Sequence, residues 1–499
     1  MGDVVGAEEY WMQDKLNRKE DAKYLLDFLA KRYQERRNQG KGGSYVLNVD
    51  AGWGRGKTFF LRGMYEQTLT RKHPAVFIDA WASEVTDDPY AAFVSEIEAY
   101  LSPILASTDD RKAAKAKDFL GAAVRNFGAM GIAASKGLVR RGAEKLIGNA
   151  VDDLVEIVTD ALSGDGVADE AGAAAVEEAG KAVREAIDLV DEQAKRLIAE
   201  YRVAQKSRAD FRTNLQAAIE AFAAMTDAKL PFIIFIDELD RCKPPYAIAM
   251  LERIKHLFDV DGIAFVLATD TAQLAHSICA VYGAEFDGRK YLQRFFARTF
   301  RLPDPDMRAF VGALLAHRSD RDRWAVPGDD KDPATFLALM SQALGMRLRD
   351  AEQCIELLLD ITTSWDQEFP IELVVIYPMI FAHMEGLDHD LDPPRRDPLW
   401  PAASRRLSEK PGMHVYFDRT ATEIHSIFGQ FQTFLGEPRS RIVADSAASH
   451  RRSGSHQVAY VLEAIQREFD IRDPSGGDPE IRPFVRRYPD IINHAYFRP

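Results

Sequence analysis

A glycine-rich turn that follows a strand-like apolar run constrains the fold of this chain more than any other stretch. The turn reads Ala51-Gly52-Trp53-Gly54-Arg55-Gly56-Lys57-Thr58. The run 45–49 before it has the length and β-branched content of a buried strand, and apolar residues recur at helical spacing from 59 to 65. A strand, a glycine-rich loop and a helix in this order predict a phosphate-binding loop.

The residues of this turn have expected roles in binding a nucleotide. Gly54 and Gly56 let backbone N–H groups close around the phosphates, Lys57 reaches the β- and γ-phosphates, and the Thr58 hydroxyl binds Mg²⁺. The predicted nucleotide-binding residues are Gly52, Trp53, Gly54, Arg55, Gly56, Lys57 and Thr58. The usual pattern has glycine at the position of Ala51, so we expect a slightly different loop shape. The alternative is a glycine-rich turn with an incidental lysine.

A second stretch ends an apolar run in two carboxylates. The run 232–236 is followed by Asp237 and Glu238. A buried strand ends in a carboxylate where that carboxylate has a positive partner or a metal, because an unpaired buried charge is expensive. We expect Asp237 to join Thr58 at Mg²⁺ and Glu238 to orient or deprotonate the water that attacks the γ-phosphate. A surface acidic pair after a core strand is the alternative.

Strand-like runs alternate with helical patterns along the chain. The expected strands are 45–50, 75–80, 232–237, 263–269 and 297–302. They predict a three-layer α/β core with a parallel sheet of five strands, whose ligands bind at the carboxyl ends of the strands. Asp270, at the end of the fourth run, is either a catalytic sensor or a helix N-cap. Trp81 either lines a site or packs under the helix that follows.

These motifs together resemble the KAP family of P-loop NTPases, named partly for a neuronal membrane scaffold and partly for a plasmid-borne phage-exclusion protein. The resemblance is carried by the loop 52–58, by Ala80-Trp81, by Ile236-Asp237-Glu238-Leu239-Asp240-Arg241-Cys242, by the strand 266–270 and by Tyr291-Leu292-Gln293-Arg294. It covers roughly residues 15 to 360, apart from the segment 103–205. It implies ATP and Mg²⁺, a core of the additional-strand class and a variable insertion between the two nucleotide motifs.

The resemblance also suggests roles for several charged residues. Arg294, near the last strand, is a candidate to neutralise transition-state charge in its own or a neighbouring subunit. The segment 345–352 resembles a sensor segment in a helical lid, with Arg349 as the candidate for the γ-phosphate. Asp240 is either a second acid near the metal with Arg241 as its partner, or it forms a structural salt bridge with Arg241 where the strand ends. The predicted catalytic set is Glu238, Lys57, Asp270, Arg294 and Arg349.

At 499 residues the chain is too long for one compact core, and its composition changes along its length. We expect the first half of an NTPase core at 1–102, a helical insertion rich in Ala, Glu and Lys at 103–205, the second half of the core at 206–303, a helical lid at 304–380 and a helical C-terminal extension at 381–499. These boundaries predict an NTPase core with helical additions.

Composition narrows the class of protein. A net charge of -13 does not favour a nucleic-acid partner, although a local basic patch stays possible. The three cysteines are scattered and suggest neither a disulfide framework nor a zinc site. The apolar stretch 119–139 contains Arg125 and Lys136, which argue against a membrane span. The alternative for this region is an amphipathic helix at 119–147 that lies on a membrane surface. We expect a cytoplasmic protein that acts with a protein partner or by self-assembly.

The predicted function is that of a Mg²⁺-dependent ATPase whose nucleotide state controls assembly or a partner, in anti-phage defence or signalling. One alternative is a scaffold that holds nucleotide without turnover. The other is an ATP-driven nucleic-acid motor or loader. Such a protein requires a basic channel, which the net charge of -13 does not indicate.

Overall fold

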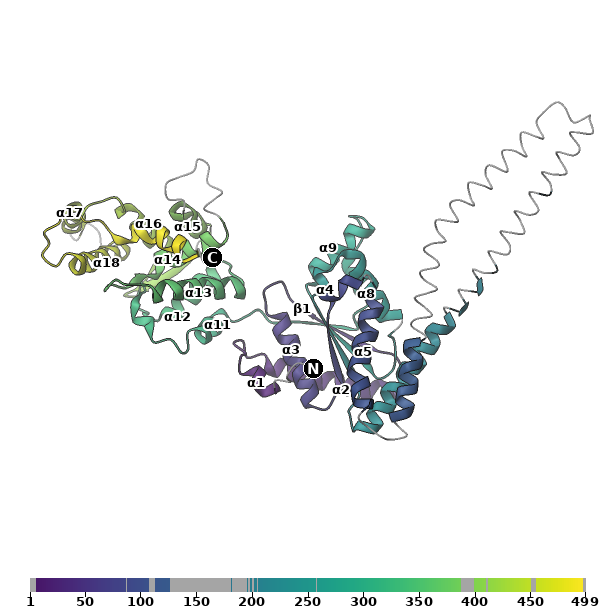
Figure 1. Ribbon diagram of the computed structural model, residues 1–499. Helices are drawn as coiled ribbons and strands as arrows, with labels where there is room; N and C mark the ends of the chain where they lie inside the picture. Colours follow the sequence, from purple (N-terminus) through teal and green to yellow (C-terminus); the bar gives the residue numbers. More distant parts are fainter. Residues whose placement is uncertain are drawn as a thin grey trace, which may run out of the picture. The chain divides into compact units, whose positions relative to one another are not determined.

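The computed structural model describes residues 6–86, 88–106, 113–125, 205–256, 258–386, 399–409, 412–449 and 455–496, with isolated helical positions at 181, 195, 198, 199, 202 and 203 (Figure 1). The chain divides into two compact units. The first comprises Met1–Met12, Lys19–Gly52 and Lys57–Leu302, and the second comprises Gln13–Arg18, Trp53–Gly56 and Pro303–Pro499.

The first unit is built on a parallel sheet. Its strands are β1 (Tyr45–Asp50), β2 (Ala75–Asp79), β3 (Phe232–Asp237), β4 (Ile263–Thr269) and β5 (Arg298–Arg301), in the order β2-β3-β4-β1-β5. The register sets Leu47 beside Val266 and Val266 beside Phe235. The predicted five-stranded parallel sheet is confirmed. Because β4 lies between β1 and β3, an additional strand separates the strand of the phosphate-binding loop from the strand that ends in Asp237.

Helices cover both faces of this sheet, because β3 and β4 are buried at every position and alternate residues face opposite sides. The helical elements are α1 (Ala7–Trp11), α2 (Lys19–Asn38), α3 (Lys57–Thr70), α4 (Ala80–Ser83), η1 (Glu84–Thr86), α5 (Pro89–Ala106), η2 (Leu239–Arg241), α8 (Pro244–His256), α9 (Thr271–Tyr282) and α10 (Gly288–Leu292). Ile233 and Phe235 pack with α1, α2 and α3, whereas Ile234 and Ile236 pack with α5, α8, α9 and α10. The predicted three-layer architecture is confirmed.

Two helices, α1 and α2, precede β1, and Asn17 lies between them in the chain, in the left-handed region at a φ of 54°. One expectation about the first unit needs correction. Residues 113–125 are helical and bury Ala116 and Leu120 in the core, so part of the segment expected as an insertion contributes to the core. Most of the expected insertion, including 126–180, lies outside the described residues.

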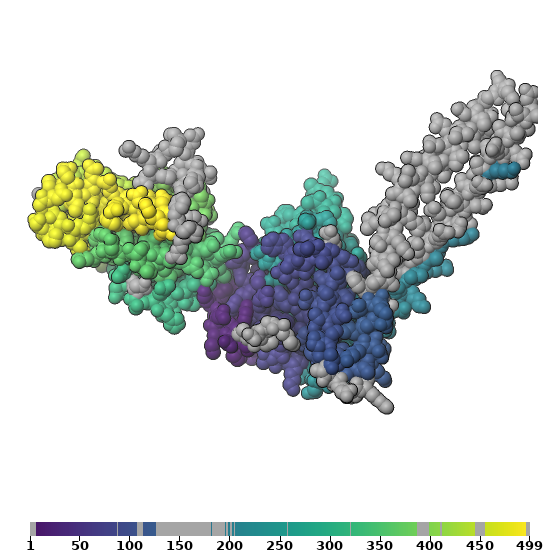
Figure 2. Space-filling view, in the orientation of Figure 1, coloured from purple at the N-terminus to yellow at the C-terminus, as the bar shows by residue number. Residues whose placement is uncertain are grey.

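The first unit is assembled from both sides of that segment. In Figure 2, blue atoms from before residue 126 adjoin teal atoms from after residue 204 in one body. The sheet explains this, because β2 pairs with β3 although about 150 residues separate them in the chain.

The second unit is largely helical. Its elements are α11 (Met307–Leu314), η3 (Asp320–Arg323), β6 (Trp324–Ala325), α12 (Pro333–Ala343), α13 (Leu348–Thr363), β7 (Ile371–Glu372), α14 (Leu373–Met384), α15 (Leu399–Ser408), β8 (His414–Phe417), β9 (Thr420–Glu423), α16 (Ile424–Phe434), α17 (Arg439–Ser449), α18 (His456–Arg472), η4 (Phe484–Arg487) and α19 (Tyr488–Tyr496). Sequence analysis did not anticipate the parallel pair β6-β7 or the hairpin β8-β9, since strands of two to four residues leave little periodicity.

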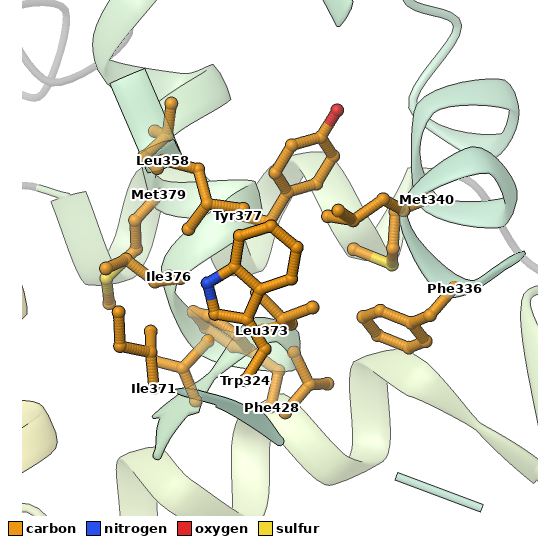
Figure 3. Close-up of a cluster of buried hydrophobic side chains, with 14 of the residues drawn as sticks. Trp324, Phe336, Met340, Leu358, Ile371, Leu373, Ile376, Tyr377, Met379 and Phe428 are labelled. Carbon is orange, nitrogen blue, oxygen red and sulfur yellow. The ribbon is translucent and has the colours of Figure 1, made fainter. Parts of the chain in front are cut away.

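One hydrophobic core runs through the second unit. Figure 3 shows part of it, where Trp324, Phe336 and Phe428 lie around the apolar helix α14. The residues expected as a lid at 304–380 and those expected as an extension at 381–499 both contribute to this core. No helix in the described part of the chain has both the length and the apolar character needed to cross a membrane.

Candidate functional site

The glycine-rich loop begins at the carboxyl end of β1. Gly54 and Gly56 have φ angles of 74° and 78°, in the left-handed region that glycine adopts without strain. Ala51 is buried, its N–H donates to the Thr269 carbonyl (3.1 Å), and it is not among the residues with positive φ. The alanine that departs from the usual pattern therefore stands where glycine is not required, and its methyl group packs in the core.

Lys57, the first residue of α3, is a buried cation with two partners. Its Nζ donates to the Ala51 carbonyl (2.8 Å) and lies 3.5 Å from Asp240 Oδ2. The side chains of Lys57 and Asp240 are only 9% and 8% exposed. The lysine thus closes the loop on itself and is neutralised by a carboxylate from η2.

Asp237 ends β3 with its carboxyl group buried. Oδ1 accepts from the Glu238 amide (2.9 Å), whereas Oδ2 has no hydrogen-bond partner among the described residues. Burial raises the pKa of Asp237, the nearby Thr58 side chain and the Glu238 amide oppose the rise, and the charge of Asp240 adds to it. A carboxyl group close to Thr58 that keeps an unpartnered oxygen is suited to a cation.

Glu238 adopts a backbone conformation that is rare for a residue other than glycine. Its φ and ψ are 61° and 21°. The turn is fixed by two donors to the Glu238 carbonyl, the Arg241 amide (3.1 Å) and the Cys242 thiol (3.7 Å). Such strain persists only where the surroundings determine the conformation, and it is concentrated at functional sites.

The side chain of Glu238 pairs with Arg241. Glu238 Oε2 lies 2.7 Å from Arg241 Nη1, and the glutamate side chain is 15% exposed. Burial raises the pKa of Glu238 and Arg241 opposes the rise, while Asp237, Asp79 and Asp240 add to it. The expected pairing of Asp240 with Arg241 is wrong: Asp240 pairs with Lys57, and Arg241 pairs with Glu238.

The surroundings of Trp81 also differ from those expected for a residue packed under a helix. It lies in α4, directly after β2, and is 53% exposed. The Arg241 guanidinium lies 5.7 Å from the centroid of the Trp81 ring. The tryptophan therefore belongs to the surroundings of Glu238 through the arginine, and the expectation that it packs under a helix is wrong.

Asp270 caps a helix. Its side chain accepts from the Gln273 amide (3.1 Å) at the N-terminus of α9, which is the N-cap alternative. A catalytic role for Asp270 stays a prediction.

A buried polar network that sequence analysis missed links β1 to the same edge of the sheet. Thr269 Oγ1 donates to Asn48 Oδ1 (2.8 Å), and Asn48 Nδ2 donates to Thr271 Oγ1 (3.0 Å). The Thr271 amide in turn donates to Asp50 Oδ1 (2.9 Å). The available signal was Asn48 itself, because a polar residue inside an apolar strand needs a buried partner.

The arginines predicted to act on phosphate are exposed. Arg294 follows α10, and its carbonyl accepts from Lys255 Nζ (2.9 Å). Arg349 lies in the first turn of α13, and its role remains a prediction.

Within the second unit, the loop residues Trp53–Gly56 have other basic neighbours. The Arg347 guanidinium lies 5.8 Å from the Trp53 ring centroid, and a Cβ on Gly54 would lie 3.2 Å from the Arg347 side chain. Arg18 donates to the Arg55 carbonyl (2.6 Å) and to the Pro303 carbonyl (3.2 Å). Sequence analysis selected Arg349 rather than Arg347 and gave no role to Arg18.

The residues present fit a nucleotide with a hard divalent cation. The loop offers two glycines in the left-handed region, the N-terminus of α3 and a lysine, which suit phosphate oxygens. Thr58 is exposed, and the buried Oδ2 of Asp237 lacks a partner within the described part of the chain. No group of three or more His, Cys, Asp or Glu side chains suited to a metal occurs in the described ranges.

Comparisons with known proteins agree with this geometry. The family model described as KAP family P-loop domain matches residues 38–364, which is more than half of the chain. The Phage T7 exclusion protein of Escherichia coli (strain K12) is 26% identical over 97 residues, a match that covers 19% of this chain and 13% of that protein. The family predicted from the motifs is confirmed.

Proposed function

Because this chain belongs to the KAP family of P-loop NTPases, whose fold implies nucleotide binding, we propose that it binds ATP with Mg²⁺ and hydrolyses the β–γ phosphoanhydride bond. The observation that carries the proposal is the unpartnered buried oxygen of Asp237 close to Thr58, at the same end of the sheet as Lys57 and Glu238. A cation site, a phosphate site and a carboxylate for water are thus available together.

Each residue has a distinct part in this reaction. The amides of the loop and the N-terminus of α3 bind phosphate oxygens, and Lys57 exchanges the Ala51 carbonyl for the β- and γ-phosphates. Thr58 and Asp237 hold Mg²⁺, which when bound supplies positive charge to the phosphate oxygens. Glu238 orients the attacking water and accepts its proton on a carboxylate oxygen.

We further propose that the nucleotide state acts as a switch for a partner or for self-assembly. Lys57 supports this idea, because its exchange between internal ligands and phosphate changes the surroundings of Asp240 and η2. A relative named for the exclusion of phage T7 supports a role in defence against phage, although the match covers 13% of that protein.

The test is steady-state phosphate release with Mg²⁺ and ATP, together with nucleotide affinity, for the native chain, Lys57→Ala and Glu238→Gln. The controls are Lys23→Ala and Glu35→Gln, which change exposed side chains on α2. We expect Lys57→Ala to lose binding and turnover, and Glu238→Gln to bind ATP and lose turnover by a factor of about 10² to 10⁴. The controls should match the native chain.

Other outcomes separate the competing functions. Binding by the native chain without turnover, in the presence of Mg²⁺, would favour a nucleotide-binding scaffold. Absence of nucleotide binding would contradict the proposal as a whole.

A further inference from the structure

The ion pair between Glu238 and Arg241 gives one oxygen of the glutamate a fixed partner. Oε2 lies 2.7 Å from Arg241 Nη1, and the glutamate side chain is 15% exposed. A carboxylate that orients water needs one oxygen available and the torsions of its side chain restricted. The ion pair restricts the side chain through a single named oxygen.

Two features among the described residues hold Arg241 in place. The 3₁₀ turn η2 returns the chain so that the Arg241 amide bonds the Glu238 carbonyl (3.1 Å), which brings the side chains of residues three apart together. The guanidinium also lies 5.7 Å from the ring centroid of Trp81 on α4. A cation over an indole face is attracted by the negative face of the ring.

The charges around Glu238 show why it needs such a partner. Asp79, Asp237 and Asp240 all lie close enough to act electrostatically on Glu238. Lys57 pairs with Asp240, and Asp79 caps α4 by accepting from the Ala82 amide (2.9 Å). Among the described residues, Arg241 is the cation that pairs with Glu238, so without it the neighbouring carboxylates would repel the glutamate from this position.

We propose that Arg241 is a positioning residue of the hydrolytic site, which holds Glu238 Oε2 so that Oε1 is available to the attacking water, and that Trp81 holds Arg241 in place. This inference rests on the proposed ATPase function and goes beyond it, because it assigns the roles of Arg241 and Trp81. The arginine acts through Glu238 and not on the phosphates.

The test is a double-mutant cycle between Arg241→Ala and Glu238→Gln, with kcat, KM and the Kd for ATP measured for each variant. We expect Arg241→Ala to lower kcat by about 10-fold to 100-fold, the loss typical of a misplaced catalytic group, with Kd changed less than about threefold. The double variant should be no slower than Glu238→Gln alone, because Arg241 acts through the glutamate. Arg241→Lys keeps the charge and should restore part of kcat, and Trp81→Phe should be closer to native than Trp81→Ala.

Arg253→Ala is the matched control, because Arg253 on α8 also stacks on an aromatic ring, that of Tyr90 at 4.2 Å. It should keep the native kcat. Thermal unfolding of every variant separates misfolding from loss of positioning, and Arg241→Lys tests the proposal if Arg241→Ala does not fold.

Several results would overturn the inference. A native or raised kcat in Arg241→Ala would show that the ion pair does not assist hydrolysis or restrains it. A further loss in the double variant beyond that of Glu238→Gln would show that Arg241 acts directly on the nucleotide. In both cases the loss in Glu238→Gln would leave the proposed function standing, whereas a native rate in Glu238→Gln would overturn both.

Discussion

Replacing Asp240 by asparagine removes the charge that neutralises Lys57 in the absence of nucleotide. The two groups are 3.5 Å apart and both side chains are more than nine-tenths buried. At an effective dielectric constant of about 20, their attraction is on the order of 5 kcal/mol, and breaking a buried pair by removing one partner typically destabilises a protein by about 3–5 kcal/mol. Asparagine keeps a carbonyl oxygen, so we expect a loss of about 3 kcal/mol.

This loss is measurable by calorimetry of the full chain without nucleotide. For a unit of this size, 3 kcal/mol lowers the midpoint of thermal unfolding by about 6–12 °C. Asp227→Asn is the matched control, because Asp227 pairs with Lys72 at 3.8 Å but the two side chains are 95% and 69% exposed. An exposed pair contributes about 0–1 kcal/mol, so the control should shift by no more than 2–4 °C.

Nucleotide gives the experiment a second arm. If phosphates take over the charge of Lys57 as proposed, saturating ATP with Mg²⁺ should narrow the difference between the native chain and Asp240→Asn. If Asp240→Asn lowers the midpoint of thermal unfolding no more than Asp227→Asn does, the argument that the buried pair stabilises the chain without nucleotide is refuted.

Three further predictions concern other parts of the chain. Gly56→Ala forces a side chain onto a φ of 78°, a strain of about 1–2 kcal/mol, and should weaken ATP binding by about tenfold in a titration; a native Kd would contradict it. Burial raises the pKa of Glu468 to about 7, so the folded state binds its proton more tightly than the unfolded state. The free energy of unfolding, measured in urea, should therefore fall by an amount on the order of 3 kcal/mol as the pH rises from about 4.5 to 7. Glu468→Gln should reduce this dependence of stability on pH, and an unchanged dependence would count against the prediction. Trp324→Phe removes the hydrogen bond from Trp324 Nε1 to Thr362 Oγ1 (2.8 Å), and Trp324 lies in the core drawn in Figure 3. Chemical denaturation should show that the free energy of unfolding falls by about 2 kcal/mol, and a fall below about 0.5 kcal/mol would contradict this prediction.

Much of the first unit could be predicted because its strands have a clear sequence pattern. The runs ending at Asp50, Asp237 and Thr269 are apolar, bounded by turns and buried on both faces, so the predicted limits 45–50, 232–237 and 263–269 match those of the structure. The backbone conformation of Gly54 and Gly56 could also be predicted, since only a few backbone conformations bind phosphate.

The partners of the charged residues could not be predicted from spacing. Arg241 pairs with Glu238 because the chain turns at a glutamate with positive φ, which the side chain of Glu238 gives no reason to expect. Asp240 then points to Lys57, which is 183 positions away in the sequence. Tertiary geometry produced two pairings that the sequence analysis had not considered.

The second unit was harder to anticipate. Its helical character follows from apolar periodicity, but one core joins segments as distant as α11 and α19. The hairpin β8-β9 depends on Asp418 and Arg419, both at positive φ, and neither residue type is a strong turn signal without a glycine beside it. Long-range packing and turn conformation therefore had to come from the structure.

The most direct test of the account is a single-turnover experiment with Mg²⁺ and ATP on the native chain and Glu238→Gln, with each protein in excess over nucleotide. The account predicts that both bind ATP, that the native chain converts bound ATP to ADP and phosphate, and that Glu238→Gln keeps the bound nucleotide as ATP at least about 100 times longer. Conversion at the native rate by Glu238→Gln would contradict the assignment of Glu238 and with it the central claim.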